Sequence, residues 1–307
     1  MSVTGAPFAF IGAGEPDGHV PPPALDRADH LRDDADALAA LWPQARVIVL
    51  DEQGNALAEA DHGPLLPTGA AISGGPGGVG AAAFLGLDDE GVARFSLDAT
   101  LTAWQAPSRI DLRTAAALWP LREAAIFAEA RALQHWRARH RFCGVCGGEV
   151  SRSRAGWLGR CAQCHVEHYP RTDPAVIVAV SDGERLLLGR QAGWAPRRYS
   201  VLAGFVEPGE SLEQTVVREV AEETGVRVRA CRYAGSQPWP FPSALMLGFT
   251  AQAATRDLTA GDGELAELRW LSRDTLRAGL TSGALSLPPA FSVAFHLIRD
   301  WLARAPD

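Results

Sequence analysis

Three glutamates in the C-terminal half of the chain have a spacing that could hold a divalent cation. Glu219, Glu222 and Glu223 lie within four positions, so they project from one side of a helix. Carboxylates this close repel one another by about 0.2–0.5 kcal/mol per pair on an exposed helix, unless a cation lies among them. Mg²⁺ takes hard oxygen ligands, typically one or two carboxylates together with substrate phosphates. The spacing indicates a divalent-metal site; the alternative is a solvated acidic face in which Arg218 pairs with Glu222.

The residues around these glutamates mark a loop, a helix and the end of that helix. Pro208-Gly209 predicts a turn, Ser211 is a good N-cap, and Gln214 completes a capping-box pattern. Gly225 is placed to end the helix. Apolar residues at every fourth position predict one buried face: Leu212, Val216 and Val220. This ordered setting favours the metal site over the solvated face.

A second candidate metal site lies upstream and uses sulfur. Two Cys-x2-Cys pairs supply four thiolates in a short segment: Cys143, Cys146, Cys161 and Cys164. Four thiolates in two such pairs suit a tetrahedral zinc ion, and a closed shell of four ligands makes that zinc structural. The fifth cysteine, Cys231, lies in an alternating strand pattern and is expected to be a small buried hydrophobe.

The segment around the cysteines is basic on an acidic chain. The 307 residues carry 29 basic and 36 acidic side chains, for a net charge of -7, so a generally basic nucleic-acid-binding surface is not predicted. Between Arg131 and Arg171, however, the sequence contains eight arginines and only two acidic residues. This local excess fits either attraction for a polyphosphate or RNA, or a solvated face beside an acidic neighbour.

A stiff aromatic segment follows the acidic helix. Ser236-Gln-Pro-Trp-Pro-Phe-Pro-Ser243 alternates prolines with Trp239 and Phe241. Proline fixes φ and removes a donor, so we expect this segment to lie outside the middle of a sheet. It could present both aromatic rings to a flat base, or it could simply fill space in a packed loop.

The remaining pattern predicts a mixed α and β protein without a membrane span. Short apolar runs predict strands at Arg46–Leu50, 81–87, 93–97, 175–180, 186–188, 226–234, 245–251 and 268–271. Helices are expected within 113–141 and 288–304. No segment has the pattern of a signal peptide or a spanning helix, so a cytoplasmic protein is expected. Gly74-Gly-Pro-Gly-Gly78 is followed by no Gly-Lys-Ser/Thr and is predicted to be a plain loop.

The acidic helix and its loop resemble the Nudix box. The match runs from Gly204 through Glu210 and Arg218 to Glu223 and Gly225, with every defined position filled. Nudix proteins hydrolyse a nucleoside diphosphate linked to another group. The resemblance implies an α/β/α sandwich with a mixed sheet, in which Glu219 and Glu223 bind metal directly. It makes Glu222 a third ligand or one acting through water, and Arg218 and Glu210 an ion pair that braces the loop.

The four cysteines, the box and the aromatic segment together resemble the NADH pyrophosphatase subfamily of Nudix hydrolases. That subfamily cleaves the pyrophosphate of NAD(H) to AMP and nicotinamide mononucleotide, and removes NAD caps from RNA 5′ ends. The resemblance implies three sets of residues. The catalytic set is Glu219, Glu222 and Glu223. The metal set adds Ala203, through its carbonyl, and Glu264 for magnesium or manganese. The substrate-binding set is Arg113, Tyr169, Phe205, Gln237, Pro238, Trp239, Pro240, Phe241, Pro242, Ser243, Ala244 and Ala294.

Two positions depart from the subfamily pattern. Ala244 stands where the pattern has serine, with Ser243 one position earlier, and Gly156 stands where it has a substrate-contacting glutamate. The resemblance also implies a homodimer in which Tyr169 of one chain meets Phe205 of the other. Either Glu222 or Glu223 would take a proton from water. The alternatives are a Nudix hydrolase of another substrate such as ADP-ribose, and a non-catalytic zinc-ribbon RNA-binding protein.

These inferences combine into an α+β chain with three expected domains. Residues 1–138 would form a mixed α/β domain of the NADH pyrophosphatase type. Residues 139–170 would form the zinc ribbon with one zinc, and residues 171–307 the Nudix sandwich. Expected substrates are NAD(H) and NAD-capped RNA, with no membrane partner.

Overall fold

The computed structural model describes residues 11–12, 23–77, 81–259 and 263–304. These residues form two compact units. The first comprises Asp173–Trp239 and Ala244–Asp307 with the chain start, and the second comprises Pro22–Thr172 with the short turn Pro240–Ser243. The zinc-ribbon segment thus groups with the N-terminal residues, and the three-way division stays a prediction. Within the described ranges, no helix is long and apolar enough to cross a bilayer.

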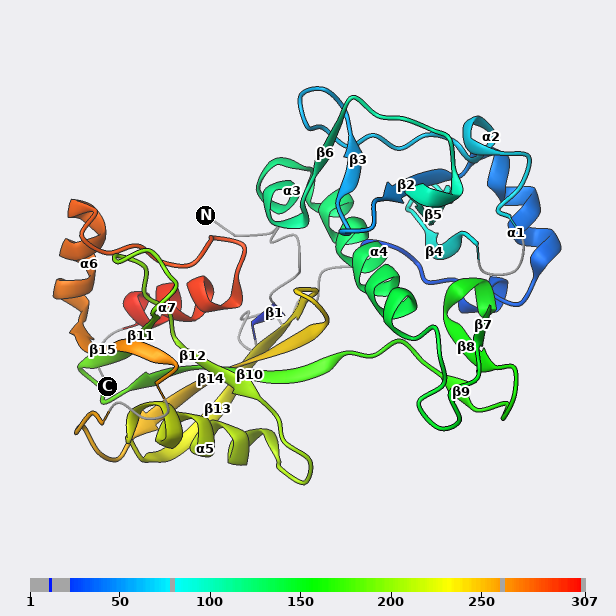
Figure 1. Ribbon diagram of the computed structural model, residues 1–307. Coiled ribbons are helices and arrows are strands. Elements are labelled where there is room, and N and C mark those ends of the chain that lie inside the picture. The colour runs from blue at the N-terminus through cyan, green and yellow to red at the C-terminus, as the bar shows by residue number, and fades with distance from the viewer. Residues whose placement is uncertain (1–10, 13–22, 78–80, 260–262, 305–307) are drawn as a thin grey trace. The chain divides into compact units, whose positions relative to one another are not determined.

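The C-terminal unit is a mixed sheet between helices (Figure 1). The strand order is β1 (Ile11–Gly12), β13 (Val228–Trp239), β14 (Ala244–Ala253), β10 (Asp173–Ser181), β11 (Arg185–Gln191) and β15 (Leu265–Ser272), with β12 (Leu202–Phe205) also paired to β10. The β10–β14 pair is parallel and its neighbours are antiparallel. Helix α5 (Leu212–Thr224) covers one face, and α6 (Arg273–Ser282) and α7 (Val293–Ala303) cover the other. The predicted α/β/α sandwich with a mixed sheet is confirmed.

Strand β10 shows why its sequence is continuously apolar. Val176 and Val178 pack with the core beneath α5, while Ile177 and Ala179 pack with the core beneath α7. Because successive side chains of a strand point to opposite faces, a strand covered on both faces needs apolar residues at every position. The run predicted as a strand is therefore the centre of the sandwich.

The N-terminal unit contains two separate sheets. The larger has the order β4 (Ala83–Leu87), β5 (Ala93–Asp98), β2 (Arg46–Leu50), β3 (Ala56–Ala58) and β6 (Ser108–Ile110). Its helices are α1 (Ala35–Leu41), α2 (Gly69–Ile72), α3 (Leu112–Leu118) and α4 (Leu121–Arg139). The three-stranded ribbon sheet consists of β7 (Val150–Ser153), β8 (Leu158–Cys161) and β9 (Glu167–His168). The strands and helices predicted here are present. Residues 74–77 of the glycine cluster form a loop after α2, and Gly78 lies outside the described residues.

The prolines of the proline-rich segment lie outside the middle of the sheet, as expected, although the segment begins within a strand. Strand β13 continues to Trp239, with Pro238 opposite Leu245 of β14. The short strand β1 pairs with β13 only at Gly235 and Ser236. Among the described residues, β13 has a strand neighbour on one side only beyond Ser236, and a proline is tolerated where the strand edge is open. Only Pro240–Ser243 leaves the sheet as a turn.

Candidate functional site

Helix α5 begins and ends at the residues that its sequence indicated. Ser211 accepts a hydrogen bond from the Gln214 amide, and the Gln214 side chain accepts one from the Ser211 amide, which completes the capping box. Gly225 ends the helix with φ 72°, in the left-handed region that glycine tolerates. Val216 and Val220 are fully buried. The opposite side of the helix is thereby fixed toward the loop that carries Gly204 to Glu210.

The guanidinium group of Arg218 connects this loop to the glutamates through hydrogen bonds. This group donates to both carboxylate oxygens of Glu210, at 2.6 and 2.9 Å. It also donates to Glu219 Oε1 at 2.9 Å and to Glu222 Oε2 at 3.0 Å. A further bond of 2.9 Å reaches the carbonyl oxygen of Phe205. The expected Arg218–Glu210 ion pair is confirmed, and the Arg218–Glu222 pair of the alternative interpretation exists alongside it.

The hydrogen bonds of Arg218 affect the pKa values of two carboxyl groups near the loop. The Arg218 guanidinium lowers the pKa of Glu210 to about 2, so this carboxylate stays ionised well into the acid range. Burial raises the pKa of Glu219, the bonds from Arg218 oppose that rise, and the negative charges of Glu222 and Glu264 add to it. Glu219 thus senses several like charges at once, as a ligand in a cation site would.

Gly204 shows how closely the loop approaches the acidic helix. A Cβ built on Gly204 would lie 1.8 Å from the carboxylate carbon of Glu219. No residue other than glycine fits there without moving that carboxylate. Ala203 precedes Gly204 in the same strand, β12, and lines one cavity together with Glu223. Carbonyl and carboxylate oxygens are donors that fit Mg²⁺ or Mn²⁺.

The three box glutamates differ in exposure. Glu223 is 5% exposed although it is ionisable, whereas the side chain of Glu222 is 54% exposed. Glu219 lies between these extremes, with 15% of its side chain exposed. Because an ionised carboxylate is buried only when a cation or hydrogen bonds compensate it, Glu223 is the box glutamate whose charge most needs such compensation.

A cavity of about 180 Å³ opens beside Glu223 within the C-terminal unit. Its walls include four predicted site residues: Ala203, Glu223, Trp239 and Ala294. They also include three residues that sequence reasoning missed: Gln191, Trp194 and Arg198. These three lie at the end of β11 and in the following loop, and no motif marks them. Their position beside Glu223 depends on the sheet order and on the Gly189–Ser200 bridge, which a single sequence does not display.

Gln237 has its side-chain amide engaged within the protein. Its nitrogen donates to the Phe291 carbonyl and its oxygen accepts from the Val293 amide, each at 2.7 Å. The residue is fully buried and fixes the start of α7. Ala294, a predicted substrate-lining residue, follows directly in that first turn. Gln237 therefore helps to place one wall of the cavity.

The turn after β13 is bound by arginines of the N-terminal unit, to which that turn belongs. The Arg113 guanidinium lies 4.0 Å from the centroid of the Phe241 ring, and that of Arg131 lies 5.4 Å from it. Arg131 also donates a hydrogen bond to the Pro240 carbonyl. Arg113 and Phe241, predicted from separate parts of the sequence, are thus brought together. Trp239 instead packs near Phe291, with ring centroids 6.2 Å apart.

The remaining predicted substrate residues have contrasting surroundings. Phe205 and Tyr169 are 60% and 61% exposed, which leaves both rings available for stacking. Tyr169 donates its hydroxyl hydrogen to Glu167. Ala244 is buried opposite Trp239 in β14. Gly156, at the other departure from the family pattern, packs against Ala83 in the N-terminal unit, where its φ of 93° suits glycine.

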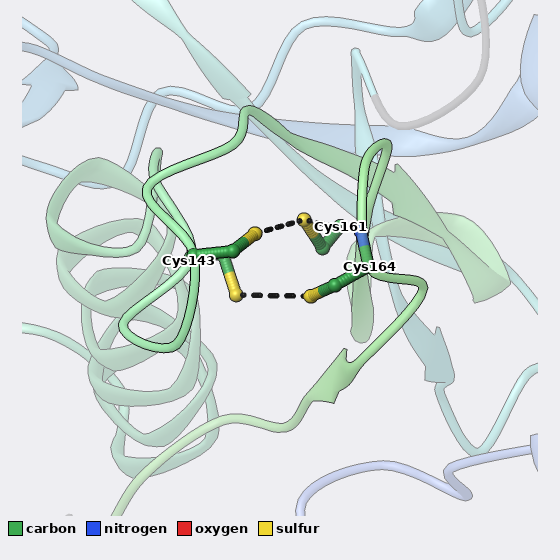
Figure 2. A group of neighbouring side chains, drawn as sticks. Cys143, Cys161 and Cys164 are labelled. Atoms are coloured by element: carbon green, nitrogen blue, oxygen red, sulfur yellow. Dashed lines mark hydrogen bonds between the residues drawn. The ribbon is translucent and has the colours of Figure 1, made fainter.

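The four cysteines of the ribbon converge on one point (Figure 2). Their sulfur atoms all lie within 4.8 Å of one another, with Sγ–Sγ distances of 3.6 Å for Cys143–Cys164 and 3.4 Å for Cys146–Cys161. A tetrahedral zinc site with bonds of about 2.3 Å has sulfur–sulfur edges of about 3.8 Å. Backbone donors, first among them the Cys164 amide, lower the pKa of Cys161 to about 6 and favour its thiolate. The set fits a closed, structural zinc site.

Comparisons with known proteins agree with this arrangement. Residues 171–291 match the NUDIX domain, and residues 138–169 match the NADH pyrophosphatase zinc ribbon domain. The chain is 39% identical over 292 residues to a Mycobacterium bovis protein named NAD-capped RNA hydrolase NudC, covering 91% of this chain and 92% of that protein.

More distant similarity extends to an animal protein and a solved structure. A human protein named NAD-capped RNA hydrolase NUDT12 is 38% identical over 199 residues, covering 61% of this chain and 43% of that protein. A solved NUDIX hydrolase from Nitrosomonas europaea covers 53% of this chain and 90% of its own, with 26% identity and a TM-score of 0.42.

Proposed function

Since this chain belongs to the Nudix hydrolases of the NADH pyrophosphatase type, we propose that it hydrolyses the pyrophosphate of NAD(H) to AMP and nicotinamide mononucleotide and removes NAD caps from RNA 5′ ends. The observation that carries this proposal is the acidic helix itself. Three glutamates of α5 are organised around Arg218, and the buried one opens onto a cavity.

The divalent ion in this proposal is Mg²⁺ or Mn²⁺. Glu219, Glu222 and Glu223 would hold it, with the Ala203 carbonyl and Glu264 completing the donor set. When bound, such an ion neutralises pyrophosphate charge and lowers the pKa of a bound water. The donors are all oxygens; burial raises the pKa of Glu219, and the negative charges of Glu222 and Glu264 add to that rise, so a cation bound there would be stabilised by Glu219 and its neighbours.

Residues of the chain position the carboxylates and accept the proton in this proposal. Arg218 keeps the carboxylates of Glu219 and Glu222 in fixed positions, so little reorganisation is needed when substrate binds. Glu223 is the better candidate to accept the proton of the attacking water, because it lines the cavity. Glu222 is engaged by Arg218 and is mostly exposed, which suits a supporting role.

Substrate-binding roles are proposed for residues of each unit taken by itself. Trp239 and Ala294 line the cavity beside Glu223, and Gln237 places α7. Phe205 offers an exposed ring next to the loop that Arg218 holds. Arg113 and the Phe241 turn form a cationic and aromatic pair suited to phosphate and base contacts. Pro238, Pro240 and Pro242 hold that segment stiff, and Ser243 at its end is a further candidate for substrate contact.

We propose in addition that the chain works as a cytoplasmic homodimer. Tyr169 and Phe205 are exposed aromatic side chains, and exposed aromatic residues are enriched at protein interfaces. In this arrangement Tyr169 of one chain and Phe205 of its partner stack on the same base. The ribbon also exposes Phe142, Val145 and Val166, which adds apolar surface near Tyr169 in sequence.

Product analysis tests the substrate assignment. The purified protein is incubated with NADH, NAD-capped RNA and ADP-ribose in turn, with Mg²⁺ and then Mn²⁺, and the products are separated by chromatography. We expect AMP and reduced nicotinamide mononucleotide from NADH, and 5′-monophosphate RNA from capped RNA. Efficient cleavage of ADP-ribose with neither NADH nor capped RNA cleaved would assign the chain to a different Nudix substrate.

A further inference from the structure

Arg198 is a half-buried cation in the cavity wall. Its guanidinium lies over the Trp194 ring, 5.0 Å from the centroid. Its Nε is buried and has no hydrogen-bond partner in the described part of the chain. The backbone is held by the Ala195 carbonyl and by a bridge to Ser286, so the position of the residue does not depend on its side-chain charge.

Three other arginines of the C-terminal unit are paired with carboxylates. Arg218 binds Glu210, Arg190 pairs with Glu267, and Arg185 pairs with Asp182. Arg198 forms no such pair within the described ranges. Stacking on Trp194 holds the guanidinium in place but does not neutralise it. A cation that has no paired anion in the wall of a ligand cavity attracts or repels the charged groups of the ligand.

Under the proposed function, the cavity encloses the nicotinamide half of the substrate. In NAD-capped RNA the adenosine continues into the RNA chain, so that half needs an open path. The nicotinamide ring is a terminal group and can be enclosed. The cavity of about 180 Å³, with Trp194 and Trp239 in its walls, suits one flat ring rather than a chain that continues.

The two redox forms of this ring differ by one charge. The ring of NAD⁺ is a cation, whereas the dihydronicotinamide ring of NADH is neutral. The charged residues of the cavity wall are Glu223 and Arg198. In the proposed mechanism Glu223 faces the divalent ion, which compensates its negative charge. Arg198 then repels the cationic ring and leaves the neutral one unaffected.

We propose that Arg198 is a specificity-determining residue that favours NADH over NAD⁺ and over RNA caps carrying the oxidised ring. This inference rests on the proposed function and adds the residue that sets the preference between redox forms. Removing the charge should raise activity toward the oxidised substrate, which is an unusual outcome for a cavity-wall substitution and is not expected from a merely structural role.

The test compares variants that change charge with variants that keep it. Arg198→Gln and Arg198→Met remove the charge, and Arg198→Lys retains it. Arg197→Gln is the matched control, because Arg197 is the exposed neighbour, outside the cavity wall, and bonds the Gly283 carbonyl. The measured quantity is the ratio of kcat/KM for NAD⁺ to that for NADH, with melting curves to confirm folding.

We expect the ratio to rise roughly fivefold to tenfold in Arg198→Gln and Arg198→Met, as for loss of one partly screened charge. It should stay at the parental value in Arg198→Lys and Arg197→Gln. A parallel change in both substrates, or no change, would overturn the inference. Dissociation constants for oxidised and reduced nicotinamide mononucleotide, measured by calorimetry, give the same comparison without turnover. That comparison stands even if the parent protein hydrolyses neither dinucleotide, which would count against the proposed function alone.

Discussion

At the scale of single residues, the site depends on one very close approach. The Gly204 backbone lies against the Glu219 carboxylate, where a methyl group would overlap it. A Gly204→Ala variant should therefore displace Glu219 by about an ångström while the fold persists. Misplacement on that scale costs on the order of 100-fold in rate.

Steady-state NADH hydrolysis and thermal melting of Gly204→Ala measure both parts of this prediction. A control substitution, Gly193→Ala, changes a glycine whose added Cβ meets nothing within 4 Å. Full activity in Gly204→Ala would show that the position of Glu219 is not critical.

Glu210 makes a prediction about acid stability. Arg218 lowers its pKa to about 2 from an ordinary value of 4.5. A carboxylate with a depressed pKa stabilises the fold fully above its ordinary pKa and loses that contribution as the pH falls toward the lowered value. Compared with the parent, Glu210→Gln should be less stable at about pH 6, and the difference should shrink by about pH 3.

Urea unfolding in the presence of a chelator, at both pH values, measures this difference. Glu213→Gln is the control, because Glu213 lies exposed in the first turn of the same helix. A stability difference that stays constant with pH would mean that the Glu210–Arg218 pair is not its source.

At the scale of elements, the ribbon is too small to be stable through its own core. Its three strands are short, and four converging sulfur atoms take the place of a buried apolar cluster. Cys161→Ser should remove bound zinc and lower the free energy of unfolding by about 2–4 kcal/mol, with dimer content falling before chemistry is affected.

Zinc analysis and melting curves test the role of the ribbon. Cys231→Ser is the matched control, since that thiol packs against the Nudix core and belongs to the other unit. An unchanged melting curve for Cys161→Ser would contradict a structural zinc.

At the scale of the whole molecule, the sequence predicted individual helices and strands better than the contacts between residues that are distant in sequence. The continuous apolar run from Ala175 to Val180 and the caps of the acidic helix each identify their element locally. The engagement of the Gln237 amide by α7 could not be predicted in this way, because the partners lie more than fifty residues away. That Pro238 would lie within a strand could not be predicted for a similar reason: whether a proline fits a strand depends on which edge of that strand is open.

The cavity wall shows the same limit. Trp194 and Arg198 lie in a loop rich in small and turn-forming residues, and no spacing rule connects them to Glu223. The Nudix box, by contrast, carries its chemistry within twenty-odd residues. Sites assembled from one loop and one helix are therefore visible in a sequence, and walls added by distant loops are not.

Assembly is a prediction about the whole chain. A homodimer should have about twice the 32.7 kDa mass of the chain, measured by light scattering during size-exclusion chromatography. Tyr169→Ala should reduce activity more than it reduces folding stability, because the exposed ring makes few internal contacts. A monomer with full activity would contradict the proposed pairing of Tyr169 with Phe205.

The central claim is that Glu223 and its neighbours bind a divalent ion at the pyrophosphate of the substrate. One comparison tests this claim most directly. NADH hydrolysis with Mg²⁺ is measured for Glu223→Gln, for the control Glu213→Gln and for the parent, alongside their melting curves. The account predicts a loss of at least about 1,000-fold for Glu223→Gln with the fold retained, and parental rates for Glu213→Gln. Parental turnover by a folded Glu223→Gln variant would contradict it.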